Sequence, residues 1–233
     1  MSHDFFLGIK KLTSKRIIRK AASHNLREMY RYITPPKSID SSKSNLNIIL
    51  KGASTASGVE AYANQLMKNT GIIKIRANAV RCLEVVFSLP VDTQIDLHDY
   101  FSACVVWAGQ YFSGQENILS AIVHLDQAHP HCHLLLLPIK DDRLKGSDMF
   151  GNKGTLFAMH QSFKKEVTSK YQLWVSANRA TVANRRDWAT QVVGTLKKRN
   201  DVVLSSQLWS LVRTSIERNP APYHAALGLS VSL

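Results

Sequence analysis

The sequence predicts an α+β fold, an α/β sandwich in which helices flank a central, mostly antiparallel sheet. Apolar segments of strand length are interleaved with longer amphipathic segments of helical period. Two strand segments, residues 118–125 and 131–139, are separated by five turn-forming residues only, which makes them an antiparallel hairpin. Hydrophobic residues make up 45% of the 233 residues, enough for a packed core.

The first half of the chain supplies strands, expected at residues 5–12, 45–50 and 80–89, and helices, expected at 15–32 and 57–68. The first strand is expected at a sheet edge. Thr13 and Ser14 offer N-caps for the first helix, and the prolines that follow Thr34 end it. Ile18, Ala22 and Leu26 recur every four residues and predict a core-facing stripe.

The second half continues the alternation of helices and strands. Asp96 caps an amphipathic helix whose aromatic residues are expected in the core rather than on a base-stacking surface. After the hairpin, helices are expected at residues 155–170, 188–199 and 203–218, with a polar linker or exposed arm from Asn178 to Arg186. We therefore expect a main domain over residues 1–178 and a short helical C-terminal extension over residues 179–233.

The charge balance points to a polyanionic partner. Thirty lysines and arginines stand against 17 acidic residues, a formal net charge of +13, and nucleic acid is the commonest partner of such a chain. The sequence has no apolar run of about 18 residues and no signal-peptide pattern, and its three cysteines lack a CxxC spacing. We expect no stable membrane insertion and a cytoplasmic location; the oligomeric state stays open.

Four of the nine histidines lie within ten positions, from His124 to His133. On a strand, His131 and His133 share one face, and His124 supplies a third imidazole across the hairpin. This pattern predicts a metal site, with a pH-sensitive histidine cluster as the alternative. Imidazoles alone suit zinc, copper, iron or nickel, whereas oxygen-rich coordination suits manganese or magnesium. His129 lies in the turn, where a solvated loop residue is equally expected.

A row of basic residues surrounds another histidine, His24. Lys20, His24, Arg27 and Arg31 recur at helical spacing, and neighbouring positive charges disfavour the imidazolium form. His24 is therefore expected to be neutral, the form that can act as a nucleophile. The helical pattern alone favours the alternative, a polar residue on a DNA-contacting face. The serine-, lysine- and asparagine-rich segment 37–47 is typical of phosphate-binding loops.

Three motifs carry a family resemblance. Residues 124–133 have the form H-x-D-Q-x-x-P-H-x-H, residues 24–27 the form H-N-x-R, and residues 43–47 the form K-S-x-x-N. Over residues 5 to 175 the chain resembles the Mob/Pre plasmid mobilisation and recombination relaxases, of the MobV type, within the HUH endonuclease superfamily. The resemblance is specific at the third motif, where Gln127 stands in place of the usual glutamate.

The resemblance implies a bacterial enzyme that nicks one strand of single-stranded or supercoiled plasmid DNA at an origin of transfer. Such an enzyme stays attached to the 5′-phosphate and later rejoins the strand, and a conjugative coupling protein is a further implied partner. His24 would be the nucleophile, and one Mn²⁺ or Mg²⁺ ion would be held by three histidines. The implied metal ligands are His124, His131 and His133.

The remaining site residues complete this expectation. Arg27 is expected to contact phosphate, and Asp126 either to orient a ligand histidine or to accept turn N–H bonds. DNA contacts are expected from Lys20, Asn25, Arg31, Lys43, Ser44 and Asn47.

Two alternatives stay open. In the first, the chain is a replication initiator or transposase of the same superfamily, and Tyr30 or Tyr32 is its nucleophile. Alternatively, Gln127, which cannot act as a base, marks a non-catalytic DNA-binding or regulatory relative.

Overall fold

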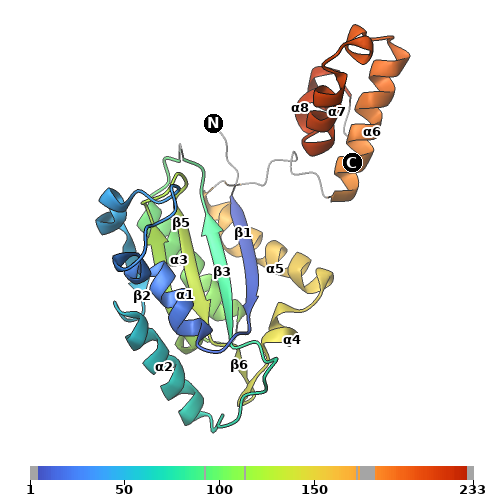
Figure 1. Ribbon diagram of the computed structural model, residues 1–233. Helices are drawn as coiled ribbons and strands as arrows, with labels where there is room; N and C mark the ends of the chain where they lie inside the picture. Colours follow the sequence, from blue (N-terminus) through green and yellow to red (C-terminus); the bar gives the residue numbers. More distant parts are fainter. Residues whose placement is uncertain (1–4, 92, 113, 172, 174–181, 230–233) are drawn as a thin grey trace. The chain divides into compact units, whose positions relative to one another are not determined.

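A five-stranded, fully antiparallel sheet forms the centre of the fold, in the order β1-β3-β5-β4-β2 (Figure 1). The computed structural model describes residues 5–91, 93–112, 114–171, 173 and 182–229. The strands are β1 (Phe6–Leu12), β2 (Ile48–Lys51), β3 (Cys82–Ser88), β4 (Ile118–His124) and β5 (His131–Leu136). The α+β prediction, including the edge position of the first strand, is confirmed.

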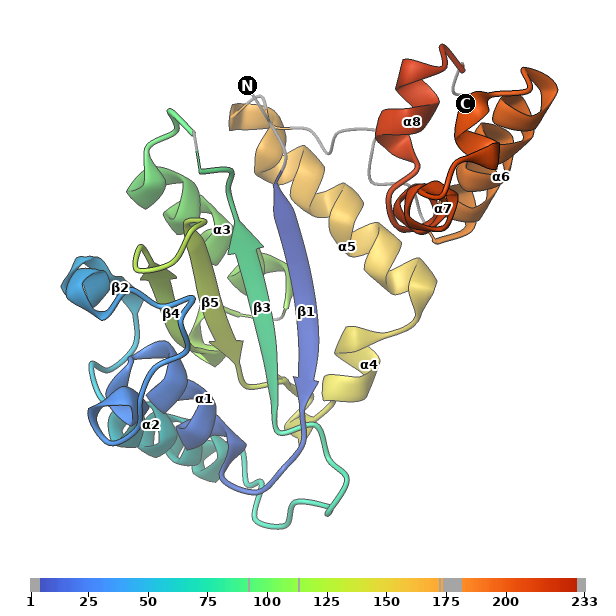
Figure 2. The same cartoon turned by 45° about the horizontal axis from the view of Figure 1, so that its top comes forward.

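Helices cover both faces of the sheet (Figures 1 and 2). On one face lie α1 (Ile17–Asn25) and α2 (Ala56–Asn69), which pack on each other over a small apolar cluster with strands β4 and β5. On the other face lie α3 (Leu97–Tyr111) and α5 (Lys153–Glu166), over a larger core rich in aromatic residues. Burial of these apolar faces holds the layers together.

Strand register decides which side chains face which helix layer. In β5, the side chain of Cys132 is buried in the aromatic core, so His131 and His133 emerge on the opposite face, toward α1. His124 is paired directly with His131 across the hairpin. The hairpin therefore gathers all three imidazoles on the face that α1 and α2 cover.

The predicted third helix is confirmed in detail. The Asp96 side chain accepts the backbone N–H of Asp99 at 2.7 Å, as expected of an N-cap. Tyr100, Phe101 and Phe112 are fully or almost fully buried, so the aromatic residues of this segment form core.

The first helix is the main correction. The sequence predicts one helix from Lys15 to Tyr32, but α1 ends at Asn25, and η1, a 3-10 helix (Glu28–Arg31), follows. Arg27 between them has a left-handed backbone with φ of 62°, which breaks the helix. Neither Thr13 nor Ser14 caps α1: its N-cap is Arg16, which makes no side-chain cap bond.

Smaller corrections concern element ends. β5 stops at Leu136, before Pro138, and residues 139–144 form the two-residue strands β6 (Ile139–Lys140) and β7 (Arg143–Leu144). A short helix α4 (Gly146–Phe150) was not expected, and α5, capped by Asn152, begins two residues before the predicted start. The further 3-10 helices are η2 (Ser41–Leu46), η3 (Gln115–Asn117), η4 (Thr168–Tyr171) and η5 (Val202–Ser205).

Contacts within the chain divide it into two units, residues 1–174 and 175–233. The second contains α6 (Val182–Lys198), α7 (Trp209–Arg218) and α8 (Ala221–Ala226), packed around Val192 and Ile216. Part of the expected linker, residues 178–181, lies outside the described residues, and the rest belongs to α6. Over the described residues, no helix is long and apolar enough to cross a membrane.

Gly52 provides a test of the packing between β2 and β4. Its φ is +97°, and an added Cβ would overlap the backbone carbonyl oxygen of Leu119. Gly71, which ends α2, has a φ of +69° but open space around it. We expect Gly71→Ala to lower the free energy of unfolding by about 1 kcal/mol and Gly52→Ala by about 3 kcal/mol or more. Urea denaturation measures both, and equal losses would contradict the assigned overlap.

Candidate metal centre and nucleophile

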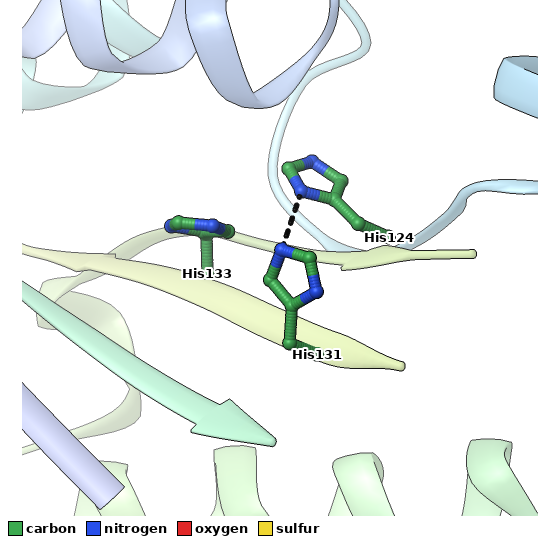
Figure 3. A group of neighbouring side chains, drawn as sticks. All are labelled: His124, His131 and His133. Atoms are coloured by element: carbon green, nitrogen blue, oxygen red, sulfur yellow. Dashed lines mark hydrogen bonds between the residues drawn. The ribbon is translucent and has the colours of Figure 1, made fainter. Parts of the chain in front are cut away.

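Three imidazoles converge at the end of the β4–β5 hairpin that carries its turn (Figure 3). His124 is the last residue of β4 and is fully buried, whereas His131 and His133 come from β5 and are half-buried. Each ring offers one nitrogen to a common centre, and these three nitrogens lie within 4.8 Å of one another. Because two hydrogen-bonded strands carry the rings, their spacing is set by the sheet.

The outward nitrogen of each ring is bound to an acceptor. His124 Nε2 donates to the carbonyl oxygen of Asn25 at 2.7 Å, and His131 Nδ1 donates to that of His129 at 2.7 Å. His133 Nδ1 donates to a carboxylate oxygen of Glu84 at 2.9 Å. A neutral imidazole has only one N–H, so these bonds leave a lone pair on each inward nitrogen.

The close approach of the inward ring nitrogens is explained by a cation between them. His124 Nδ1 and His131 Nε2 are 3.3 Å apart, and with the outward protons placed as above neither has a hydrogen to share. Two nitrogens bound to one metal at a right angle are about 3 Å apart, given metal–nitrogen bonds of about 2.1 Å. The donor set and its spacing therefore fit a divalent metal ion.

The surroundings favour the neutral form of two of the three imidazoles, His124 and His131. Burial, with smaller contributions from His133 and Arg27, lowers the pKa of His124 to about 2. Burial also lowers the pKa of His131 below its ordinary value. Since a protonated imidazole cannot bind metal, lowered pKa values let these rings compete for metal in mildly acidic solution.

His24 lies beside this centre, on the last turn of α1. Its ring centroid is 6.3 Å from that of His133, and its Nδ1 is 3.0 Å from the hydroxyl oxygen of Tyr30. Burial and the charges of Arg27 and His133 lower the pKa of His24, so it is neutral at pH 7. If Nδ1 donates its proton to the Tyr30 oxygen, the lone pair is on Nε2.

A buried ion pair ties this part of the site together. Arg27 donates to both carboxylate oxygens of Asp126, at 2.8 and 2.7 Å, and both side chains are almost fully buried. Ser44 and Asn47 donate to the same carboxylate at 2.7 and 2.9 Å. Asn47 also accepts the backbone N–H of Leu125 at 2.8 Å. The three sequence motifs therefore meet at Asp126.

The structure gives Arg27 and Asp126 partners within the chain, and their expected roles stay predictions. Arg27 is expected to contact phosphate, but its guanidinium is bound to Asp126 and Gln127. Asp126 is expected to hold a ligand histidine or accept turn N–H bonds, but it accepts side-chain bonds from Arg27, Ser44 and Asn47.

The expected DNA-contacting residues divide into two groups. Asn25 is buried, and the half-buried side chains of Ser44 and Asn47 donate to Asp126, so DNA contact by these three stays a prediction. Lys20, Arg31 and Lys43 are exposed, although Lys43 forms an ion pair with Asp40 at 3.2 Å.

The sequence patterns do not reveal the residues that orient the ligands. Glu84 is in β3, one strand away from His133, and the other two acceptors are backbone carbonyls. A carboxylate in the middle of the apolar strand Cys82–Ser88 is the one available signal, because such a position is usually filled by an apolar residue.

Tyr32, an expected alternative nucleophile, is 88% exposed, whereas Tyr30 is hydrogen-bonded to His24. Of the two tyrosines, Tyr30 is therefore the one placed in the site.

The site in this chain belongs to one structural class. It combines a three-histidine cluster suited to a metal ion with an adjacent neutral histidine, both on an antiparallel five-stranded sheet. The family model described as "Plasmid recombination enzyme" (Mob_Pre) matches residues 1–174. The chain belongs to this family.

Curated relatives agree with the family assignment. A plasmid recombination enzyme type 3 of Staphylococcus aureus is 31% identical over 139 residues, which are 57% of this chain and 33% of that protein. A plasmid recombination enzyme of Bacillus thuringiensis is 28% identical over 160 residues, which cover 66% and 34% of the two chains. The chain thus spans about a third of the length of these relatives.

Solved structures show the same fold. A MobM relaxase domain (MOBV; Mob_Pre), Mn-bound and bound to plasmid pMV158 oriT DNA, matches with a TM-score of 0.64 at 22% identity. The match covers 79% of this chain and 98% of that domain. A second structure of that domain, bound to a 26-nucleotide oriT DNA, matches with a TM-score of 0.53 at 18% identity.

The Asp126 carboxylate should dominate the acid sensitivity of the fold. Although burial opposes ionisation, hydrogen bonds from Arg27, Asn47 and Ser44 hold its pKa far below the usual range. Its stabilising contribution is complete above the pKa of an unfolded aspartate, about 4, and is lost as pH falls.

Asp126→Asn should therefore lower the free energy of unfolding by about 3 kcal/mol at pH 7, because Arg27 stays buried without a counter-charge. The difference from the unmodified protein should shrink between pH 5 and pH 2. Urea titrations across that range measure it, and a pH-independent difference would contradict the assignment.

Glu84 should strengthen metal binding through His133. Glu84→Gln keeps a hydrogen-bond acceptor for His133 Nδ1 but removes the charge, and we expect Mn²⁺ affinity to fall about 10–100-fold. Electron paramagnetic resonance of free Mn²⁺ measures the affinity. Glu60→Gln makes the same chemical change on α2, where Glu60 contacts Arg19, and should leave affinity unchanged. Equal affinities in all three proteins would sink the role of Glu84.

Proposed function

We propose that this chain is a metal-dependent DNA relaxase, which nicks one strand at an origin of transfer and later rejoins it. The observation that carries the proposal is the pairing of a three-histidine metal centre with the adjacent neutral His24. Membership of the plasmid recombination enzyme family and the fold shared with an oriT-bound relaxase domain support it. The formal charge of +13 suits a nucleic-acid substrate.

His24 is proposed as the nucleophile. Its Nε2 lone pair attacks the scissile phosphorus, an N–P bond forms, and the bond from phosphorus to the 3′ oxygen breaks. The 3′ oxygen leaves and takes up a proton, and the 5′-phosphate remains on His24 as a phosphoramidate. Attack by the 3′-hydroxyl reverses these steps and rejoins the strand.

The residues around His24 hold it ready for this attack. When His24 Nδ1–H donates a hydrogen bond to the Tyr30 oxygen, the lone pair is on Nε2, and burial together with Arg27 disfavours protonation of His24. The bond from Arg27 to Asp126 fixes the turn that follows α1. The last residue of α1 is Asn25, whose carbonyl oxygen orients His124. These groups preorganise the reacting geometry before DNA arrives.

We propose Mn²⁺ as the metal rather than Mg²⁺. The proposed ligands His124, His131 and His133 are all nitrogen donors, which Mg²⁺ binds poorly. Mn²⁺ also suits oxygen donors, so the choice between the two metals is carried by the related domain. The related relaxase domain was solved with Mn bound. When bound, the ion neutralises charge on the scissile phosphate.

One observation favours Tyr30 as an alternative nucleophile. Its hydroxyl oxygen lies 3.0 Å from His24 Nδ1, so the same contact allows His24 to act as a base for Tyr30. The two assignments differ in which residue retains the DNA.

Domain limits and partners complete the proposal. We infer that residues 1–178 form the relaxase domain and residues 179–233 a helical extension, in a cytoplasmic bacterial protein. A conjugative coupling protein is a candidate partner of the nicked complex.

The test uses single-stranded oligonucleotides that tile the DNA flanking the gene, incubated with the protein and a panel of divalent metals. We expect cleavage with Mn²⁺ and a covalent protein–DNA adduct that survives denaturation but is labile in acid. His24→Ala should abolish the adduct, whereas Tyr30→Phe should slow its formation about tenfold or more, as removal of a group that orients a reacting residue does. Cleavage should persist at pH 6, because the pKa of His24 is lowered.

The opposite pattern, an acid-stable adduct lost in Tyr30→Phe, would assign the nucleophile to Tyr30. Binding without cleavage under every metal would replace the relaxase proposal with a regulatory DNA-binding function.

A further inference from the structure

Tyr32 is the most exposed tyrosine, tryptophan or phenylalanine among the described residues, at 88% exposure. It follows η1, and its flanking residues Arg31 and Ile33 are exposed as well. A ring this exposed contributes little to the fold through burial, and its apolar face is open to contact with another molecule.

The position of Tyr32 ties it to the reacting centre. It is two residues from Tyr30, whose hydroxyl contacts His24, so their Cα atoms are at most about 8 Å apart. The far end of the same loop is also fixed to the site, because the backbone N–H of Asp40 donates to the carbonyl oxygen of Asp126 at 2.8 Å. The segment 32–39 thus runs between two anchors at the active site.

The loop is stiff and cationic. Pro35 and Pro36 fix two of its φ angles, and Ile39 is buried, which reduces the entropy that binding would cost. Arg31 and Lys37 are exposed, and no salt bridge of the described residues involves either. An exposed ring beside free cations is the combination that binds single-stranded nucleic acid, by base stacking and phosphate contact.

We propose that Tyr32 stacks on an unpaired base next to the scissile phosphate, with Arg31 contacting the adjoining backbone. This subsite rests on the proposed function and adds to it a residue that binds and positions an unpaired base beside the cleavage point. In a duplex, the faces of the bases are covered by their neighbours, so the ring has no stacking partner there. Tyr32 is a binding and positioning residue, not a nucleophile.

The test measures binding separately from cleavage. The tiling oligonucleotide with the highest affinity carries 2-aminopurine at one position at a time, and the full-length chain carries His24→Ala so that it cannot cut. We expect fluorescence quenching at one or two adjacent positions. Adding Tyr32→Ala should remove that quenching and weaken binding about tenfold, whereas Tyr32→Phe should preserve both.

Two controls separate stacking from charge and from general loss of surface. Phe157→Ala removes another exposed ring, 66% exposed, from α5 on the opposite face of the sheet, and should change nothing. Arg31→Ala should reduce the slope of log affinity against log salt by about one, whereas Tyr32→Ala should leave the slope unchanged.

The outcomes distinguish this subsite from the proposed function. Unchanged affinity and quenching in Tyr32→Ala, in a protein that still forms the covalent adduct, would overturn stacking and leave the relaxase intact. Position-specific quenching that depends on Tyr32, in a protein that never cleaves, would support stacking and overturn the relaxase. Equal quenching when the oligonucleotide is annealed to its complement would also overturn the subsite, because it requires an unpaired base.

Discussion

The buried ion pair between Arg27 and Asp126 is the interaction on which the rest of the site depends. It joins residues 99 positions apart in sequence and makes both N–H bonds of a forked guanidinium. A buried charge pair contributes little net stability compared with apolar packing, but removal of one partner is costly. Its value here is geometric. It fixes the left-handed turn at Arg27, and this turn ends α1 at the residue whose carbonyl orients His124.

The same pair explains why three motifs, distant in sequence, lie together in the fold. Ser44 and Asn47 donate to the Asp126 carboxylate, and Asn47 also accepts the N–H of Leu125. These bonds fasten the basic loop to the hairpin that carries the metal ligands. Such residues look like phosphate contacts in sequence, yet in the structure they hold the frame on which the exposed cations of the loop are carried.

Much of the site was predictable from sequence because it follows from strand periodicity. The shared face of His131 and His133, the opposite direction of Cys132 and the third ligand His124 all follow from alternation and a short turn. The break after Asn25 was not predictable, because helical spacing continues through residue 33 and only a tertiary partner opposes it. Glu84 was missed for a related reason, since the order of strands in a sheet is not written in any single strand.

Gln127 is best understood through charge rather than proton transfer. Its amide oxygen accepts a hydrogen bond from Arg27 at 3.0 Å. A glutamate carboxylate could accept the same bond in the same geometry. Arg27 and Asp126 balance each other, Glu84 carries one negative charge, and a bound divalent ion would leave the centre positive. A glutamate at position 127 would remove one unit of that positive charge. The glutamine therefore favours attraction of an anionic phosphate to the neutral His24, and the proposed displacement by His24 uses no base at position 127.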